Sequence, residues 1–413
     1  LQIAARDLTA ADPRDVLPEI AAELADLADA TVEAALALAR GEVADWANCR
    51  LGIVALGKTG AGELNYVSDV DVLYIAEPAL DDRGEPVCDP SEAMAVATRL
   101  AGALTRVCSA HTAAGTIWQI DAALRPEGKA GALVRTLASH RAYYEKWAKN
   151  WEFQAMLKAR PMAGDRELAQ GFVDLVWPMV WRVADNDQFV GEVQAMRKRV
   201  VSLLPPREAG HEIKLGAGGL RDVEFSVQLL QLVHGRADER LRVRGTFEAL
   251  AALIEHGYVG RADGADLGTA YRLERLLEHR IQLYRLRRTH LLPDDEPSQR
   301  WLARSIGLTG AGDLMQLWRS TNRRVLSLQQ RLFYSPLLEA VARIPSAEVR
   351  LTSSDAETRL RALGYGDPTA ALRHIEALSS GLTRQAEIQR QLLPAMLTWF
   401  TAGPNPDHGL LAF

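Results

Sequence analysis

The stretch LGIVALGKTGAGELNYVSDVDVLYIAE, residues Leu51 to Glu77, decides the fold expected for this chain. Its first part, Leu51 to Leu56, is a short and continuous apolar run. Its last part, Val70 to Ala76, is β-branched and aromatic apart from one aspartate. Runs of this length and composition are typical of buried strands. We therefore predict two buried strands joined by a glycine-rich turn, which is a rigid framework for a site.

The turn between the two runs contains three glycines and one lysine. We expect it to lead into a short helix near residues 61–65 and to offer backbone N–H groups to phosphate oxygens. The residues of this stretch predicted to contact phosphate are Gly57, Lys58 and Ser68. A P-loop is excluded, because Gly52 stands at the required spacing but is followed by a strand instead of a loop.

Two carboxylates, Asp69 and Asp71, stand two residues apart at the start of the second run. The period of two in a strand places both on the same face. A buried strand carries such charges only if they are paired or bind a cation, and hard oxygen ligands suit Mg²⁺ or Mn²⁺. Two alternatives stay open at this point. The pair can be an exposed turn before a strand, and metal-dependent glycosyltransferases also use D-x-D.

A third carboxylate, Asp121, ends a predicted strand over Thr116 to Asp121. Together with Asp69 and Asp71 it makes a three-carboxylate metal site, of the kind that binds one or two divalent ions against a substrate phosphate. The loop that follows offers Arg125 as a phosphate contact; a plain surface turn is the alternative.

From Leu137 onward the sequence pattern is almost wholly helical. Lys158 and Arg160 close one aromatic-rich segment and are candidate phosphate contacts, although cations near a helix end are also favoured by the helix dipole. Basic residues near 280–288 are expected to be solvated or to meet an acidic partner.

The segment IKLGAGGLRDVEF, Ile213 to Phe225, contains three glycines that lead directly into a predicted helix. The free N–H groups at such a start can bind an anion. The helix has an apolar stripe that we expect to pack and a polar stripe that we expect to be solvated. The residues predicted to contact nucleotide or phosphate here are Gly218, Gly219, Arg221 and Glu224.

Composition indicates an ordinary soluble, cytoplasmic protein of two to three domains, with 413 residues, 48% hydrophobic residues, 24% charged residues and a net charge of −5. No basic excess suggests bulk binding of nucleic acid. The three cysteines lack metal-site spacing and are expected to be reduced thiols. No run is apolar enough to span a membrane, and we expect the chain to be a piece of a longer protein.

Four segments carry a family resemblance: ALGKTGAGELNYVSDVDVLY, IDAALRPEGKAGALV, WEFQAMLKAR and IKLGAGGLRDVEF. In order and spacing they resemble the glutamine synthetase adenylyltransferase/adenylyl-removing family, within the DNA-polymerase-β-like nucleotidyltransferase superfamily. The resemblance covers about residues 52–293 well. One departure is that the usual Gly-Ser turn of the superfamily is Gly57-Lys58 here.

The resemblance implies that Asp69, Asp71 and Asp121 hold Mg²⁺ or Mn²⁺. Members of the family have two nucleotidyltransferase halves. The N-terminal half removes AMP from a tyrosine of glutamine synthetase by phosphorolysis, giving ADP, and the C-terminal half attaches AMP from ATP, in the regulation of nitrogen metabolism. The form of the Gly216 to Asp222 motif resembles the removing half. The implied partners are glutamine synthetase, a PII-type signal protein, phosphate and adenine nucleotide.

Three other functions stay open on the sequence alone. They are AMP transfer from ATP onto glutamine synthetase, a non-catalytic module that senses nucleotide or a PII-type protein, and an unrelated nucleotidyltransferase such as an antibiotic-modifying one. The expected fold class is α+β, with a small polymerase-β-like nucleotidyltransferase sheet, flanking helices and a large helical bundle region. We predict a nucleotidyltransferase domain over 1–135 with an N-terminal supporting helix, a helical domain completing the cleft over 136–335, and a helical extension and linker over 336–413.

Overall fold

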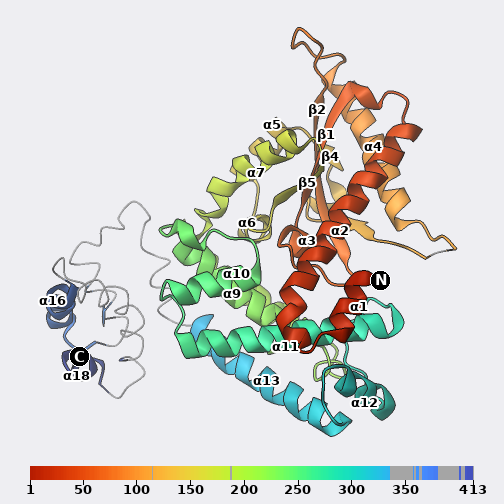
Figure 1. The fold of residues 1–413 in the computed structure, drawn as a ribbon. Helices are drawn as coiled ribbons and strands as arrows, with labels where there is room; N and C mark the ends of the chain where they lie inside the picture. Colours follow the sequence, from red (N-terminus) through yellow and green to blue (C-terminus); the bar gives the residue numbers. More distant parts are fainter. Residues whose placement is uncertain are drawn as a thin grey trace. The chain divides into compact units, whose positions relative to one another are not determined.

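The computed structural model of the chain describes residues 1–113, 115–186 and 188–334, and short segments between residues 357 and 412 (Figure 1). It divides into two compact units. The first unit consists of Leu1–Val180 and Arg275–Ala311, and the second of Trp181–Glu274 and Gly312–Phe413. Most of the predicted extension over 336–413 lies outside the described residues, and the predicted boundaries at 135 and 335 stay predictions.

The first unit is built on a mixed five-stranded sheet. β1 pairs antiparallel with β2 on one side and with β5 on the other. β3 and β4 both pair in parallel with β2, so the order is β3-β2-β1-β5 with β4 beside β2. The strands are β1 Cys49–Ala55, β2 Asp69–Pro78, β3 Gln119–Asp121, β4 Val134–Arg135 and β5 Arg160–Gly164.

Helices surround this sheet and form the described part of the second unit. In the first unit they are α1 Gln2–Thr9, α2 Pro13–Glu42, α3 Gly57–Gly60, α4 Pro90–Ser109, α5 Leu137–Lys146, α6 Asn150–Met156, α7 Arg166–Val180 and α12 Glu296–Ser305. In the second unit they are α8 Phe189–Ser202, α9 Leu220–Gly235, α10 Thr246–Glu255, α13 Ala311–Leu332, α16 Pro368–Ser379 and α18 Pro406–Leu411. The long helix α11, Arg261–Arg285, contributes its last turns to the first unit.

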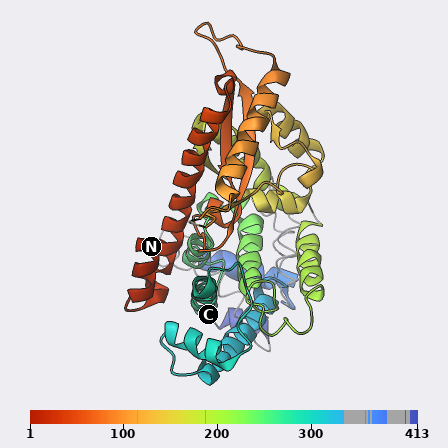
Figure 2. The same cartoon turned by 90° about the vertical axis from the view of Figure 1, so that its right-hand side faces the viewer.

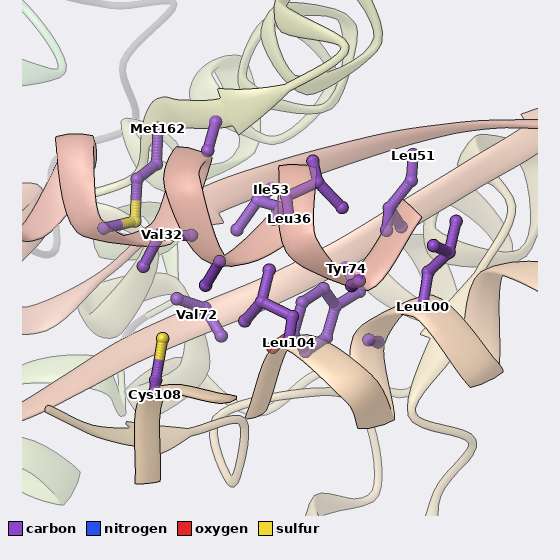
Figure 3. Packing of buried hydrophobic residues seen from close by; sticks show 14 of the residues in the cluster. Val32, Leu36, Leu51, Ile53, Val72, Tyr74, Leu100, Leu104, Cys108 and Met162 are labelled. Atoms are coloured by element: carbon purple, nitrogen blue, oxygen red, sulfur yellow. The ribbon is translucent and has the colours of Figure 1, made fainter. Parts of the chain in front are cut away.

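The sheet of the first unit lies between two helical layers. Figures 1 and 2 show α2 and α4 along one face, and Figure 1 shows α5 and α7 on the other. Alternate residues of β1 and β2 point to opposite faces, which is the ordinary pleat of a strand. Figure 3 shows the α2–α4 side, where Val32 and Leu36 of α2 pack with Leu104, Val72 and Tyr74. This buried face fixes the register of β2, because a slip of one residue would turn every side chain over.

These elements confirm the α+β class and the small nucleotidyltransferase-like sheet with flanking helices. Three local predictions for the first unit are wrong. The strand predicted over Thr116 to Asp121 is only three residues long, Gln119–Asp121. The short helix after β1 is Gly57–Gly60, and residues 61–65 are turn and loop. A strand, β5, also follows Leu137, where we predicted almost wholly helical structure. None of the helices within the described ranges is both long and apolar enough to cross a bilayer.

In the second unit, most of the polar stripe predicted on α9 is not solvated, and of its residues only Arg221 is partly exposed. Glu224, Gln228 and Gln231 are all buried, with exposed fractions of 3%, 7% and 2%. Gln231 Nε2 donates to the carbonyls of Leu241 and Val243, each at 2.9 Å, which shows how one of these polar groups is accommodated. The helix is therefore a core helix of its unit. The amphipathic pattern of its sequence predicted a solvent-exposed polar face, and this prediction is wrong for the buried polar residues.

Candidate active site

The three predicted aspartates are brought together by one pair of parallel strands. Asp71 of β2 is the direct partner of Asp121 of β3, and Asp69 is paired with Gln119. Asp69 and Asp71 alternate with the buried Val70 and Val72, so both lie on the face turned away from the α2–α4 core. Side chains paired in this way point to the same face of the sheet. The sheet therefore presents three carboxylates on one face over two neighbouring strands.

Asp69 and Asp121 have different local environments. Asp69 is paired with Arg288, and Asp121 Oδ1 accepts a hydrogen bond of 2.7 Å from the amide of Ala123. Within the described ranges, no three His, Cys, Asp or Glu side chains converge closely enough to hold a metal ion. The donor set itself fits Mg²⁺ or Mn²⁺ in kind, because it consists of hard carboxylate oxygens on adjacent strands. The residues that could hold such an ion are Asp69, Asp71 and Asp121.

A cavity of about 650 Å³ adjoins two of these aspartates, Asp69 and Asp121. This volume is in the range that binds nucleotide-sized ligands. Carboxylates and cations line it together, which is the combination that a metal-dependent phosphate site needs. Its charged and polar lining includes Asp69, Gln119, Asp121, Arg125, Lys129 and Arg288. Lys129 and Arg288 were not identified from the sequence.

The turn after β1 approaches Asp71 closely. Gly57 has a φ of +54°, and a Cβ atom at this position would overlap the Asp71 carboxylate. The amide of Leu56 donates to the Asp71 carbonyl at 2.9 Å, which fixes the turn against β2. Glycine is therefore required at 57 for both backbone conformation and space.

Gly57→Ala is expected to displace the Asp71 carboxylate. We expect the free energy of unfolding to fall by about 1–3 kcal/mol and the affinity for Mn²⁺ to fall by at least about tenfold. Urea unfolding and Mn²⁺ titration measure the two effects. Gly62→Ala is the matched control, since Gly62 has a φ of +68° but no atom within 4 Å of a Cβ. Equal Mn²⁺ affinities of the two variants would show that the contact with Asp71 is irrelevant.

Lys58 is held by a buried carboxylate. Its Nζ lies 2.7 and 2.8 Å from the two oxygens of Glu278, whose side chain has no exposure. Arg275 Nη1 donates to the same carboxylate at 2.6 Å, and His290 Nδ1 lies 3.1 Å from it. Burial alone would raise the pKa of Glu278, but Lys58, Arg275 and His290 together lower this pKa well below its usual range. Lys58 is therefore turned toward this buried network.

The last turns of α11 also fix the segment between Lys58 and β2. Arg275 Nη2 donates to the carbonyls of Glu63 and Leu64, at 2.7 and 3.2 Å. Gln282 Oε1 accepts from Asn65 Nδ2 at 2.7 Å and from the amide of Val67 at 3.0 Å. These positioning residues were not predicted from the sequence. Their spacing on α11 shows a charged helix face, which a sequence pattern alone cannot distinguish from a solvated one.

Arg125 organises the loop after β3. Its guanidinium donates to three backbone carbonyls: Nε to Gly131 at 3.1 Å, Nη1 to Ala122 at 2.9 Å and Nη2 to Lys129 at 3.1 Å. These bonds hold the loop in which Glu127 has a left-handed φ of 63°. Arg125 lines the cavity, and its predicted contact with phosphate stays a prediction.

The cations at the start of β5 are inside the fold. Lys158 is 7% exposed, and Arg160 pairs with Asp29 of α2 and donates from Nη2 to the Thr59 carbonyl at 3.0 Å. Arg160 thereby ties α2 to the α3 turn. Ser68 is partly buried and directly precedes Asp69. The predicted phosphate contacts of all three residues stay predictions.

The second glycine-rich motif lies in the second unit, and its helix start is occupied by partners from the same unit. The amides of Leu220 and Arg221 donate to the carbonyls of Ile213 and Lys214, at 2.9 and 3.0 Å. The amide of Gly218 donates to Asp222 Oδ2 at 2.6 Å.

These three amides already have acceptors within the fold, so they are not free to bind an anion. Arg221 lies 3.5 Å from the buried Glu224, and a Cβ at Gly218 would collide with Asn322 of α13. The nucleotide or phosphate contacts predicted for Gly218, Gly219, Arg221 and Glu224 stay predictions.

Comparison with known proteins identifies the relatives of the chain. Residues 1–174 match the family model described as glutamate-ammonia ligase adenylyltransferase, and residues 193–333 match that of PII-uridylyltransferase. Proteins named bifunctional glutamine synthetase adenylyltransferase/adenylyl-removing enzyme are 59% identical over 413 residues in Cutibacterium acnes, 55% over 416 in Streptomyces avermitilis and 50% over 427 in Mycobacterium marinum. Each alignment covers the whole of this chain and 41% to 42% of the relative.

The sheet with its flanking helices defines an α+β protein of the nucleotidyltransferase class. More narrowly, the chain belongs to the glutamine synthetase adenylyltransferase/adenylyl-removing family. The resemblance found in the sequence is thereby confirmed. The chain spans less than half the length of the relatives that it matches.

Proposed function

We propose that this chain removes AMP from an adenylylated tyrosine of glutamine synthetase by metal-dependent phosphorolysis, giving ADP and unmodified glutamine synthetase. The observation that carries the proposal is the in-register pair of Asp71 and Asp121, with Asp69 on the same face. Asp69 and Asp121 line a cavity together with cations. The names of the relatives, which include both adenylyl transfer and adenylyl removal, support the substrate. A cytoplasmic location and a role in nitrogen metabolism are part of the proposal.

In this reaction an oxygen of inorganic phosphate attacks the phosphorus of the AMP group. The bond from phosphorus to the tyrosine oxygen breaks, the phenolate leaves and takes up a proton, and the new bond makes ADP. A divalent ion held by Asp69, Asp71 and Asp121 would supply charge neutralisation between the two phosphates. The chain itself aligns phosphate and nucleotide in the cavity, and such chemistry depends mainly on positioning and electrostatics.

The opposite reaction, AMP transfer from ATP, uses the same kind of site, so the direction is proposed from the form of the Gly216 to Asp222 motif. The test is to incubate the chain with Mg²⁺ and either adenylylated glutamine synthetase plus phosphate or unmodified glutamine synthetase plus ATP. The ATP carries a label in its AMP portion. The proposal expects ADP in the first mixture and no labelled AMP on glutamine synthetase in the second. Labelling of glutamine synthetase without release of ADP would reverse the proposed direction.

We also propose a PII-type signal protein as a partner, because residues 193–333 match the model of a PII-uridylyltransferase. A calorimetric titration with a purified PII-type protein tests this. Saturable binding supports the partner, and no binding in either its modified or its unmodified form argues against it. A purely regulatory module would bind such a protein and nucleotide but would release no ADP from adenylylated glutamine synthetase.

A further inference from the structure

A bidentate ion pair occupies one of the three aspartates. Arg288 Nη1 donates to Asp69 Oδ1 at 2.7 Å, and Nη2 lies 2.5 Å from Oδ2. The two residues are 219 positions apart in sequence, and both line the cavity. Arg288 follows α11 by three residues, after Leu286, whose left-handed φ of 48° ends the helical path. Arg288 therefore reaches the candidate metal site from a non-helical segment.

This ion pair contributes little to the stability of the folded chain. The Arg288 side chain is 57% exposed, whereas the Asp69 side chain is 15% exposed. An exposed pair of this kind contributes little to folding, because solvent screens it and the long side chain loses freedom. The pair does neutralise the charge of Asp69. Asp69 lies on the same face of the sheet as Asp71 and Asp121, and the like charges of these carboxylates repel one another.

Arg125, a second cation of the cavity, differs from Arg288. Arg125 has its guanidinium committed to three loop carbonyls, so it cannot turn to a ligand without opening its own loop. Arg288 is bound to a carboxylate that the proposed function assigns to a divalent ion. A guanidinium fork matches the geometry of a carboxylate and of a phosphate equally well.

We propose that Arg288 is a substrate-binding residue of this site, which pairs with Asp69 while no divalent ion is bound and binds a phosphate group of the nucleotide once that carboxylate is taken. This inference rests on the proposed function for the identity of the ligand. Beyond the proposed function, we infer that Arg288 and a divalent ion compete for Asp69. When the ion displaces Arg288 from Asp69, the guanidinium becomes available to the incoming phosphate. Binding of ion and nucleotide is then coupled through one side chain.

Two affinities of the whole chain test the exchange. The affinity for Mn²⁺ alone is measured from the electron paramagnetic resonance signal of free Mn²⁺. The affinity for ADP at saturating Mn²⁺ is measured by calorimetry. Arg288→Gln is expected to bind Mn²⁺ about fivefold more tightly, because the competitor is lost. It is expected to bind ADP about tenfold or more weakly, because a charged contact to phosphate is lost. Arg288→Lys keeps the charge without the fork and should fall between the wild type and Arg288→Gln in both.

Arg287→Gln is the matched control, since Arg287 is also exposed but lines a different cavity. It should leave both affinities unchanged. An unchanged Mn²⁺ affinity or an unchanged ADP affinity in Arg288→Gln overturns the inference. Failure of the proposed function gives a different result. In that case both affinities of Arg288→Gln shift as expected, but the wild-type chain produces no ADP from adenylylated glutamine synthetase. A wild-type chain that binds neither Mn²⁺ nor ADP overturns the inference and the metal site together.

Discussion

Asp71→Asn is expected to slow the phosphorolytic removal of the AMP group from adenylylated glutamine synthetase, with formation of ADP, by about a thousandfold. Loss of one transition-state contact slows an enzyme on this scale. Asp71 is the member of the carboxylate set that lies directly opposite Asp121 and under Gly57. Asparagine has nearly the same shape, so it keeps the packing but removes the charge that the proposed metal ion needs. The rate of ADP formation at saturating phosphate measures the effect.

The same variant must keep its fold for this result to be informative. We expect its urea midpoint to equal that of the wild type, because asparagine keeps the shape of the side chain and the Asp71 carbonyl still accepts from the amide of Leu56. Asp82→Asn is the matched control, since Asp82 lies exposed in the loop after β2 and should retain full activity. Substantial ADP release by a folded Asp71→Asn protein would contradict the assignment of Asp71.

Glu278→Gln is expected to give the largest loss of stability, about 3–5 kcal/mol, because it leaves buried cations without their counter-charge. Lys58 and Arg275 both bind this carboxylate, and none of the Glu278 side chain is exposed. The free energy of unfolding of the chain, from urea denaturation, measures the loss. Since the pKa of Glu278 is lowered in the folded state, its contribution is present above the usual pKa of a glutamate and is lost as the pH falls below it.

An exposed pair provides the comparison for Glu278. Glu296 pairs with Arg300 one turn away on α12, and both side chains are more than half exposed. We expect Glu296→Gln to cost about 0.3–0.5 kcal/mol. Similar losses in the two variants would show that the Lys58–Glu278–Arg275 network is not a structural support of the glycine-rich turn.

The strand with the two aspartates was predictable because its pattern is strong and local. Apolar residues alternate with Asp69 and Asp71 at its start, and Asp121 ends the neighbouring strand. β5 was missed for physical reasons. It has five residues, RPMAG, with no β-branched side chain and with Pro161 inside it, and its described pairing is with β1 alone. A strand at the edge of a sheet tolerates a proline that a central strand does not.

The partners of the predicted site residues were not predictable from sequence patterns. Lys58 meets Glu278 and Asp69 meets Arg288 across 220 and 219 positions of the chain. Local periodicity carries no information on such pairs, and basic residues near 280–288 look like a solvated surface. Arg280 shows the error most clearly, because it is 1% exposed and pairs with the buried Asp7. Buried charges of this kind become visible only when the fold brings their counter-charges together.

The most direct test of the central claim follows labelled phosphate. Adenylylated glutamine synthetase, Mg²⁺ and ³²P-labelled inorganic phosphate are incubated with the chain, and the nucleotide products are separated. Phosphorolysis predicts that all released adenylate appears as ADP carrying the label in its β-phosphate, and that Asp71→Asn yields none above background. Release of unlabelled AMP, or no release of adenylate at all, would contradict the proposed activity.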